Sequence, residues 1–353
     1  MAKKEYYNIT NMLATNAQYM ILLGQRANGK SYQAKKTVIE NAYRTDHKFV
    51  YLRRWRADIK TKAIEQYFAD ADIRRWTEGT YDSLVCWNGS IYFGKYNKET
   101  EKVDKVKEIG KYCALNESER YKSWAFVDYD YIIYEEFITD NVYLFEEPRI
   151  LQQFVSTVAR QGSVHVIMVG NTLTRVCPYF SEWCLDGVLK QKQGTIEVYH
   201  FHVDNDVVID IAVEYCANMN YKNTMFFGQS AKQIVSGEWD TNAEPKLPKK
   251  QSCYETVYEV KVEFQKFTFI MQLMIEKEEG GAIVFVYPYT GHRNIIRKLS
   301  DEFTDSRFIT SSLDTTRRPE AIIHNCWIQN KFCYSDNLTG ADFKNIERTY
   351  KFL

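Results

Sequence analysis

The sequence predicts an α/β protein: a mainly parallel β-sheet flanked by helices, followed by a smaller strand-rich domain. In the N-terminal part, short apolar runs typical of buried strands alternate with helical patterns. A chain of 353 residues also exceeds the roughly 250–300 residues at which single cores stop growing, which favours two domains. A polar stretch containing glycine and proline is the expected linker at 225–252, between domains at 1–224 and 253–353.

Local patterns predict each element in turn. Buried strands are expected where apolar residues run together, at 19–23, 48–52, 131–134, 164–169 and 195–203. Apolar residues at helical spacing predict helices from 30 to about 44, over 57–80 and over 147–161. Asn88-Gly89 indicates a hairpin within 84–114, whose distal part, 95–111, is highly charged. In the second domain, residues 254–290 resemble strands and a helix is expected at about 291–303.

Composition excludes several classes of protein. The 46 basic and 46 acidic residues give zero net charge, so any contact with nucleic acid should be local. No stretch approaches the roughly 18 consecutive apolar residues of a membrane span, and no apolar stretch follows the N-terminus. We therefore expect neither a membrane protein nor a secreted one. The eight cysteines form no Cys-x-x-Cys pair, which predicts free, buried thiols.

The loop after the first strand matches the phosphate-binding pattern G-x-x-x-x-G-K-[ST]. Glycines let backbone N–H groups curl around phosphate oxygens, and the following helix adds its positive N-terminus. Lys30 is expected to reach the β- and γ-phosphates of ATP, and the Ser31 hydroxyl to bind Mg²⁺. A glycine-rich strand–helix turn without a ligand is the alternative. The predicted nucleotide-binding residues of the loop are Gly24, Gln25, Arg26, Ala27, Asn28, Gly29, Lys30 and Ser31.

Two acids end the strand at 131–134. An apolar strand that delivers paired carboxylates is the Walker B pattern, in which Glu135 would bind the metal and Glu136 would orient the attacking water. The first acid is usually Asp. The extra methylene of Glu135 moves its carboxylate by roughly 1.5 Å, so it could act on Mg²⁺ through a water molecule. An acidic pair that only caps a strand is the alternative.

Two further polar positions complete the expected site. Asn171 follows the strand at 164–169 and could contact the γ-phosphate at the carboxyl edge of the sheet, although a turn-forming role is equally open. Hydrolysis also needs positive charge against the transition state. Arg160 is the candidate for an arginine finger inserted into a neighbouring subunit's site, with Arg149 as second choice. A solvated helix arginine is the alternative.

The order of these motifs resembles ASCE-type P-loop ATPases, and in particular the DNA-packaging motor ATPases of phi29-like phages, which are distant relatives of terminase large subunits. The resemblance rests on the phosphate loop within the first 31 residues, Leu52-Arg53-Arg54-Trp55, the acidic pair at 135–136 and Val169-Gly170-Asn171. It covers roughly residues 15–205 and is weak beyond them.

The resemblance implies an ATPase that uses ATP and Mg²⁺ to drive double-stranded DNA into a viral procapsid. It implies a homo-oligomeric ring, usually a pentamer, docked on the portal (connector) protein. Some members use a packaging RNA as a scaffold. In such a ring Arg160 would act in trans. The expected location is the host cytoplasm, transiently on the procapsid.

DNA contacts would need basic side chains. The candidates are Arg53, Arg54, Arg56, Lys105 and Lys122, although solvated surface explains them equally well. The second domain resembles the RNase H-like nuclease module of terminases only in its strand-rich opening. Because residues 267–275 contain no acid, we expect a vestigial, docking domain without nuclease activity. Its basic residues could meet DNA, RNA or portal: Arg293, Arg297, Lys298, Arg317 and Arg318.

Two other functions remain open from the sequence. A small-molecule kinase could use the same phosphate loop, although such kinases usually carry an arginine-rich lid and do not need paired acids. A non-hydrolysing, nucleotide-dependent assembly factor would explain Glu135 in place of Asp as a sign of lost activity.

Overall fold

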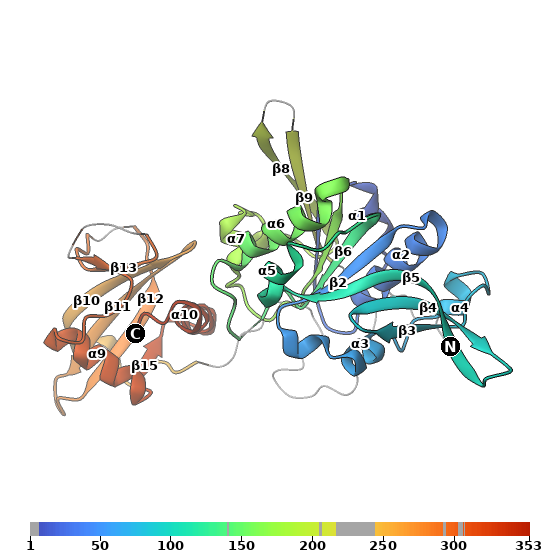
Figure 1. Cartoon of the computed structure of the whole chain (residues 1–353). Helices are drawn as coiled ribbons and strands as arrows, with labels where there is room; N and C mark the ends of the chain where they lie inside the picture. Colours follow the sequence, from blue (N-terminus) through green and yellow to red (C-terminus); the bar gives the residue numbers. More distant parts are fainter. Residues whose placement is uncertain are drawn as a thin grey trace. The chain divides into compact units, whose positions relative to one another are not determined.

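The computed structural model describes residues 7–139, 141–204, 207–216, 244–291, 294–302, 306 and 308–353. They form two compact units (Figure 1). The first comprises residues up to 138, 144–172 and 185–238, and the second comprises 139–143, 173–184 and the chain from 239 onward. The second unit thus includes two short segments that the sequence assigned to the first domain. Of the predicted linker at 225–252, residues 225–243 lie outside the described residues.

A mixed sheet forms the centre of the first unit. Within the described residues it has nine strands in the order β3-β4-β5-β2-β6-β7-β1-β9-β8. The central strands from β5 to β9 are parallel, and only the pairs β3–β4, β4–β5 and β8–β9 are antiparallel. The strands are β1 (Tyr19–Leu23), β2 (Lys48–Arg53), β3 (Ser83–Trp87), β4 (Ser90–Asn97), β5 (Lys102–Ala114), β6 (Tyr129–Glu135), β7 (His165–Val169), β8 (Thr195–Asp204) and β9 (Val207–Tyr215).

Helices cover both faces of this sheet because side chains alternate along each strand. Ile133 of β6 belongs to the same buried core as Ala34 and Val38 of α2. Its neighbour Tyr134 faces the other way, and its hydroxyl donates to Glu147 of α6 (2.7 Å). The helical segments of this unit are α1 (Thr10–Ala14), α2 (Lys30–Thr45), η1 (Arg56–Ile59), α3 (Thr61–Tyr67), α4 (Ile73–Trp76), η2 (Leu115–Glu117), α5 (Ser118–Tyr121), α6 (Glu147–Val158), η3 (Ala159–Gln161) and η4 (Val188–Lys190).

The second unit is built on a smaller sheet. In its described part, six strands run in the order β14-β13-β10-β11-β12-β15. Phe343 of α10 is fully buried in this core with Val260 and Val284 from the sheet. The elements are α7 (Pro178–Glu182), η5 (Gln251–Cys253), β10 (Tyr254–Phe264), β11 (Phe267–Glu276), β12 (Ala282–Pro288), β13 (Lys298–Ser300), β14 (Ile309–Thr310), α9 (Arg318–Ile328), β15 (Phe332–Tyr334) and α10 (Asn337–Tyr350).

The predicted α/β class, with a mainly parallel sheet and a smaller strand-rich part, is confirmed. Three element predictions need correction. The helix expected at 57–80 is broken into η1, α3 and α4, and the hairpin at 84–114 is extended by β5 into three strands. The helix expected at about 291–303 is wrong in its described part, because residues 294–297 are irregular and Lys298–Ser300 pair with β10. No helix in the described part has the length and apolar character of a bilayer span.

Candidate nucleotide-binding site

The phosphate loop follows β1 at the carboxyl edge of the parallel strands. The backbone requires glycine at two positions of the loop: Gly24 has φ +145° and Gly29 has φ +99°, conformations that residues with a Cβ rarely adopt. Gly29 caps α2, whose first residue is Lys30. The loop therefore directs the N-terminus of a 16-residue helix toward the space where phosphates would lie.

The Lys30 ammonium occupies the centre of this loop. It donates to the carbonyl oxygens of Gly24 (3.1 Å) and Gln25 (2.7 Å) and to Oδ1 of Asn28 (3.3 Å). It also lies 3.4 Å from Oδ1 of Asn171, which follows β7. Burial lowers the pKa of Lys30 to about 8. Because these hydrogen bonds, the ones that Lys30 makes within the described residues, all go to neutral oxygens, the buried ammonium provides a strong site for an anionic ligand.

Glu135 ends β6 and is buried beside the loop. The Tyr67 hydroxyl donates to its Oε1 (2.7 Å), and Ser31 lines the same cavity. Burial raises the pKa of Glu135, while the hydroxyl groups of Tyr67 and Ser31 oppose that rise. The predicted metal pair, Ser31 and Glu135, thus lines one cavity.

Glu136 has a different environment. Its φ of +57° is left-handed, and its N–H donates to the carbonyl oxygen of Val169 (2.9 Å), which ties the end of β6 to β7. Its side chain is 61% exposed, and Oε2 accepts from Arg53 Nη2 (2.6 Å). A non-glycine residue in this conformation is uncommon, and such positions cluster at functional sites.

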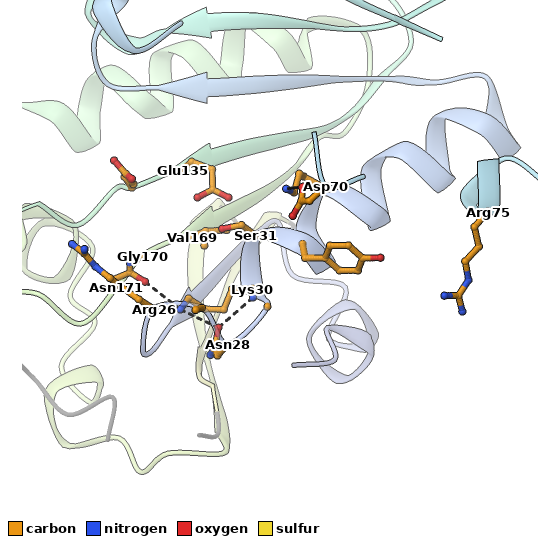
Figure 2. Close-up of a pocket in the computed structure, with 15 residues that line it drawn as sticks. Arg26, Asn28, Lys30, Ser31, Asp70, Arg75, Glu135, Val169, Gly170 and Asn171 are labelled. Atoms are coloured by element: carbon orange, nitrogen blue, oxygen red, sulfur yellow. Dashed lines mark hydrogen bonds and ion pairs between the residues drawn. The ribbon is translucent and has the colours of Figure 1, made fainter. Parts of the chain in front are cut away.

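These segments enclose one cavity of about 720 Å³. Figure 2 shows Glu135 near Ser31 and the hydrogen bonds that link Lys30 to Asn28 and Asn171. All but two of the residues predicted for nucleotide and metal binding, together with Glu136, line it. The two exceptions, Gly24 and Gln25, instead accept hydrogen bonds from Lys30 through their carbonyl oxygens. The lining residues are Arg26, Ala27, Asn28, Gly29, Lys30, Ser31, Tyr32, Lys35, Asp70, Arg75, Glu135, Glu136, Val169, Gly170 and Asn171.

Sequence reasoning missed three charged residues of this cavity, Lys35, Asp70 and Arg75. Lys35 lies four residues after Ser31 on α2, so helical spacing could have placed it on the side of the loop. Asp70 and Arg75 come from the segment around α4, and no motif marks them.

Comparison with known proteins identifies the family. A family model for podovirus DNA encapsidation proteins (Gp16) matches residues 1–230, more than half of the chain. The chain belongs to this family. Its membership confirms the resemblance to phi29-like packaging proteins and the expected function, a phage DNA-packaging ATPase.

Several solved structures match the chain. A chain of the bacteriophage phi29 genome packaging motor assembly is 18% identical, covers 98% of this chain and 99% of its own length, and gives a TM-score of 0.57. A chain of the phi-28 gp11 DNA packaging motor is 16% identical over 99% of each chain, with a TM-score of 0.51. The N-terminal domain of the phi29 packaging ATPase is 25% identical over 58% of this chain and 95% of its own, with a TM-score of 0.45. None of the curated protein sequences matches the chain.

The arginine-finger candidates of this Gp16-family chain do not line its own cavity. Arg160 is exposed in η3, which precedes the amino end of β7, whereas Asn171 follows the carboxyl end. The five residues of β7 separate these edges by roughly 16 Å. Arg149 is exposed near the start of α6 and pairs with Glu146 (3.1 Å).

The predicted DNA contacts fall into two groups. The predicted DNA contact at Arg54 needs correction, because this side chain is buried. It is 5% exposed, and its guanidinium donates to both carboxylate oxygens of Glu147 (2.7 and 3.0 Å). Arg53 is held by Glu136. The other three predicted contacts are exposed. Lys105 covers the Trp87 ring, with its ammonium 3.4 Å from the ring centroid. Lys122 pairs with Glu119 (2.6 Å), and Arg56 lies 3.7 Å from Glu117.

Arg56 lines a second cavity of about 650 Å³ near the carboxyl ends of β2 and β5. Lys60, Arg120 and the partly exposed Trp124 also line it, with Glu117 as the acid among its lining residues. Three cations against one acid make this cavity locally basic on a chain of zero net charge.

Proposed function

We propose that this chain hydrolyses ATP in the cavity of the phosphate loop and couples the reaction to movement of double-stranded DNA into a procapsid. One observation carries the proposal. Lys30 and Ser31 after β1, Glu135 and Glu136 at the end of β6, and Asn171 after β7 converge on one cavity. The carboxyl edge of a parallel sheet is where such folds bind ligands.

Mg²⁺ fits the donors that meet in this cavity. Ser31 and Glu135 supply a hydroxyl and a carboxylate to the same cavity, and hard oxygen donors of this kind suit Mg²⁺. We infer that these two residues hold the ion. When bound, Mg²⁺ neutralises charge on the β- and γ-phosphates. Lys30 and the loop amides position the phosphates, and Asn171 contacts the γ-phosphate.

Glu136 is the residue we assign to orienting the attacking water. Its position at the end of β6, beside the carboxyl end of β7, favours this role. Its ion pair with Arg53 must loosen before its carboxylate can serve the water.

The position of Arg160 favours a role in the active site of a neighbouring subunit. It lies at the edge of the sheet opposite its own phosphate loop, so it can complete only a neighbour's site. A homo-oligomeric ring, which we propose to be a pentamer on the portal protein, provides that neighbour.

The second cavity is our candidate surface for DNA. Arg56, Lys60 and Arg120 offer donors to phosphates, and Trp124 adds an aromatic face. Such a local basic surface suits a weak hold on a backbone that must slide, and its affinity falls with salt.

The second unit is proposed to dock the motor rather than to cut DNA. Its strand order β12-β11-β10-β13-β14, with β10 paired antiparallel to β11 and parallel to β13, supports an RNase H-like origin. Two of its basic candidates have a different use: Arg297 is buried and binds both carboxylate oxygens of Glu320 (2.9 and 2.7 Å), and Lys298 pairs with Glu263 (3.0 Å). Arg317 pairs with Asp314, and Arg293 lies outside the described residues. Arg318 stays a candidate contact for portal or packaging RNA.

ATP turnover with and without double-stranded DNA tests the proposal. DNA should stimulate turnover in the parent and not in Lys30→Ala, and nucleotide should shift the mass in solution toward a ring. Phosphate transfer to a metabolite would instead indicate the kinase, and binding of ATP without turnover would indicate the assembly factor.

A further inference from the structure

Tyr67 connects Glu135, the predicted metal-binding acid, to helix α3. It is the last residue of α3, and its hydroxyl donates to Glu135 Oε1 at 2.7 Å. Its ring packs against Tyr51 of β2, with the ring centroids 4.5 Å apart. Ser31 of α2 lies near the same acid (Figure 2), so Glu135 faces side chains from two elements, α2 and α3.

Lys35 fixes the position of Tyr67 in turn. Lys35 is 3% exposed, and its ammonium donates to the carbonyl oxygen of Tyr67 (2.8 Å) and pairs with Asp70. The same ammonium lies 4.6 Å from the centroid of the Tyr67 ring. Lys35 is one turn after Ser31 on α2, the helix that follows the phosphate loop. This helix therefore fixes Tyr67, and Tyr67 in turn bonds Glu135.

This arrangement compensates for the presence of glutamate at position 135, where the Walker B pattern usually has aspartate. A glutamate has one more rotatable bond than an aspartate, so its carboxylate needs additional partners to keep one orientation. Tyr67 donates to one carboxylate oxygen, which restricts that freedom and supports the ionised acid in a buried place.

We propose that Tyr67, held by the Lys35 ammonium that pairs with Asp70, is a positioning residue that sets Glu135 for the nucleotide-bound Mg²⁺. The inference rests on the proposed function of the site and names a residue that acts through Glu135. Partners of this kind behind a metal ligand typically change metal affinity by about 10–100-fold when they are removed.

The direct test is the affinity of the nucleotide-loaded protein for Mn²⁺, measured by electron paramagnetic resonance with a non-hydrolysable ATP analogue. Tyr67→Phe should weaken Mn²⁺ binding roughly tenfold and leave metal-free nucleotide binding unchanged. Tyr43→Phe is the matched control, since it removes a hydroxyl on α2 that bonds Thr80 (2.9 Å) outside the cavity. Unchanged Mn²⁺ affinity in Tyr67→Phe, even with a lowered melting temperature, would overturn the inference.

A double-mutant cycle provides the second test. An aspartate at 135 is too short to keep the Tyr67 hydrogen bond, so Tyr67→Phe should cost less Mn²⁺ affinity in a Glu135→Asp background than in the parent. Equal losses in both backgrounds would contradict the inference. If Lys30→Ala leaves nucleotide binding and ATP turnover intact, the proposed function itself fails. If Lys30→Ala abolishes them and the Tyr67 effect is absent, only the inference fails.

Discussion

Arg53 and Glu136 form an ion pair of 2.6 Å between the ends of two adjacent parallel strands, β2 and β6. Arg53 also lies 3.7 Å from Asp58 in η1, a segment that contributes to the second, basic cavity. The residue assigned to the attacking water is therefore connected through one arginine to the neighbourhood of the proposed DNA surface.

Arg53→Ala should raise ATP turnover measured without DNA. A partly exposed ion pair contributes up to about 1 kcal/mol, so freeing Glu136 should increase this basal rate by up to about fivefold. Arg74→Ala, which removes an exposed partner of Asp82 (2.9 Å), is the control and should leave the rate unchanged. A lower basal rate in Arg53→Ala would show that Arg53 orients Glu136 productively.

Glu136→Gln should separate binding from chemistry. The amide keeps the size of the side chain but cannot accept a proton, so turnover should fall roughly 10²–10⁴-fold while the nucleotide Kd stays within twofold. Stopped-flow binding of a fluorescent ATP analogue and steady-state phosphate release measure the two quantities. Parent-like turnover would remove Glu136 from the chemistry.

Arg160→Ala should abolish turnover and leave ATP binding intact, because the residue lies away from its own phosphate loop. Mixing this variant with Lys30→Ala should restore part of the activity, since some neighbours then combine an intact loop with an intact arginine. If no mixture recovers activity at protein concentrations that form the ring, the arginine does not act between subunits.

The combined change Arg56→Gln, Lys60→Gln and Arg120→Gln should weaken DNA stimulation of turnover. Each lost phosphate contact should reduce the slope of log affinity against log salt by about one. Changing Arg44, Arg74 and Lys62 to glutamine removes the same charge from other exposed positions of the first unit and should have little effect. Equal losses in both sets would indicate a response to net charge alone.

Stability of the second unit should depend on the ionisation of Asp342. Burial raises the pKa of this carboxyl to about 7, even though Arg175 Nη1 lies 3.1 Å away. Between about pH 4 and 7 the folded state therefore holds a proton that the unfolded state releases, so this group stabilises the fold at low pH and loses that contribution as pH rises to 7. The melting temperature of Asp342→Asn relative to the parent should be higher at pH 7.5 than at pH 5. A difference independent of pH would contradict the shifted pKa.

The phosphate loop could be predicted from the sequence because its chemistry is local. Gly24, Gly29 and Lys30 lie within one loop, and the backbone geometry that they need is encoded there. Glu135, Glu136 and Asn171 could be added because parallel strands end at a common edge. The β9 strand was missed although Val207–Tyr215 contains an apolar run, and it pairs with both β1 and β8.

The roles of other residues depend on long-range packing and could not be predicted from the sequence. Arg54 and Arg56 are indistinguishable in a basic stretch of sequence, yet one is buried by Glu147 and the other lines a cavity. No pattern near Arg54 in the sequence indicates its partner, Glu147, which lies 93 positions away. Tyr67 was missed for the same reason, since its significance lies in a hydrogen bond to Glu135 across 68 positions.

ATP should lie against the loop at 24–31 with its terminal phosphate facing the acids at 135–136. An experimental structure with Mg²⁺ and a non-hydrolysable ATP analogue tests it directly. We expect the γ-phosphate within hydrogen-bond distance of Lys30 and Asn171, and the ion between Ser31 and Glu135. A nucleotide bound elsewhere, or a terminal phosphate directed away from Glu135 and Glu136, would contradict this placement of the active site.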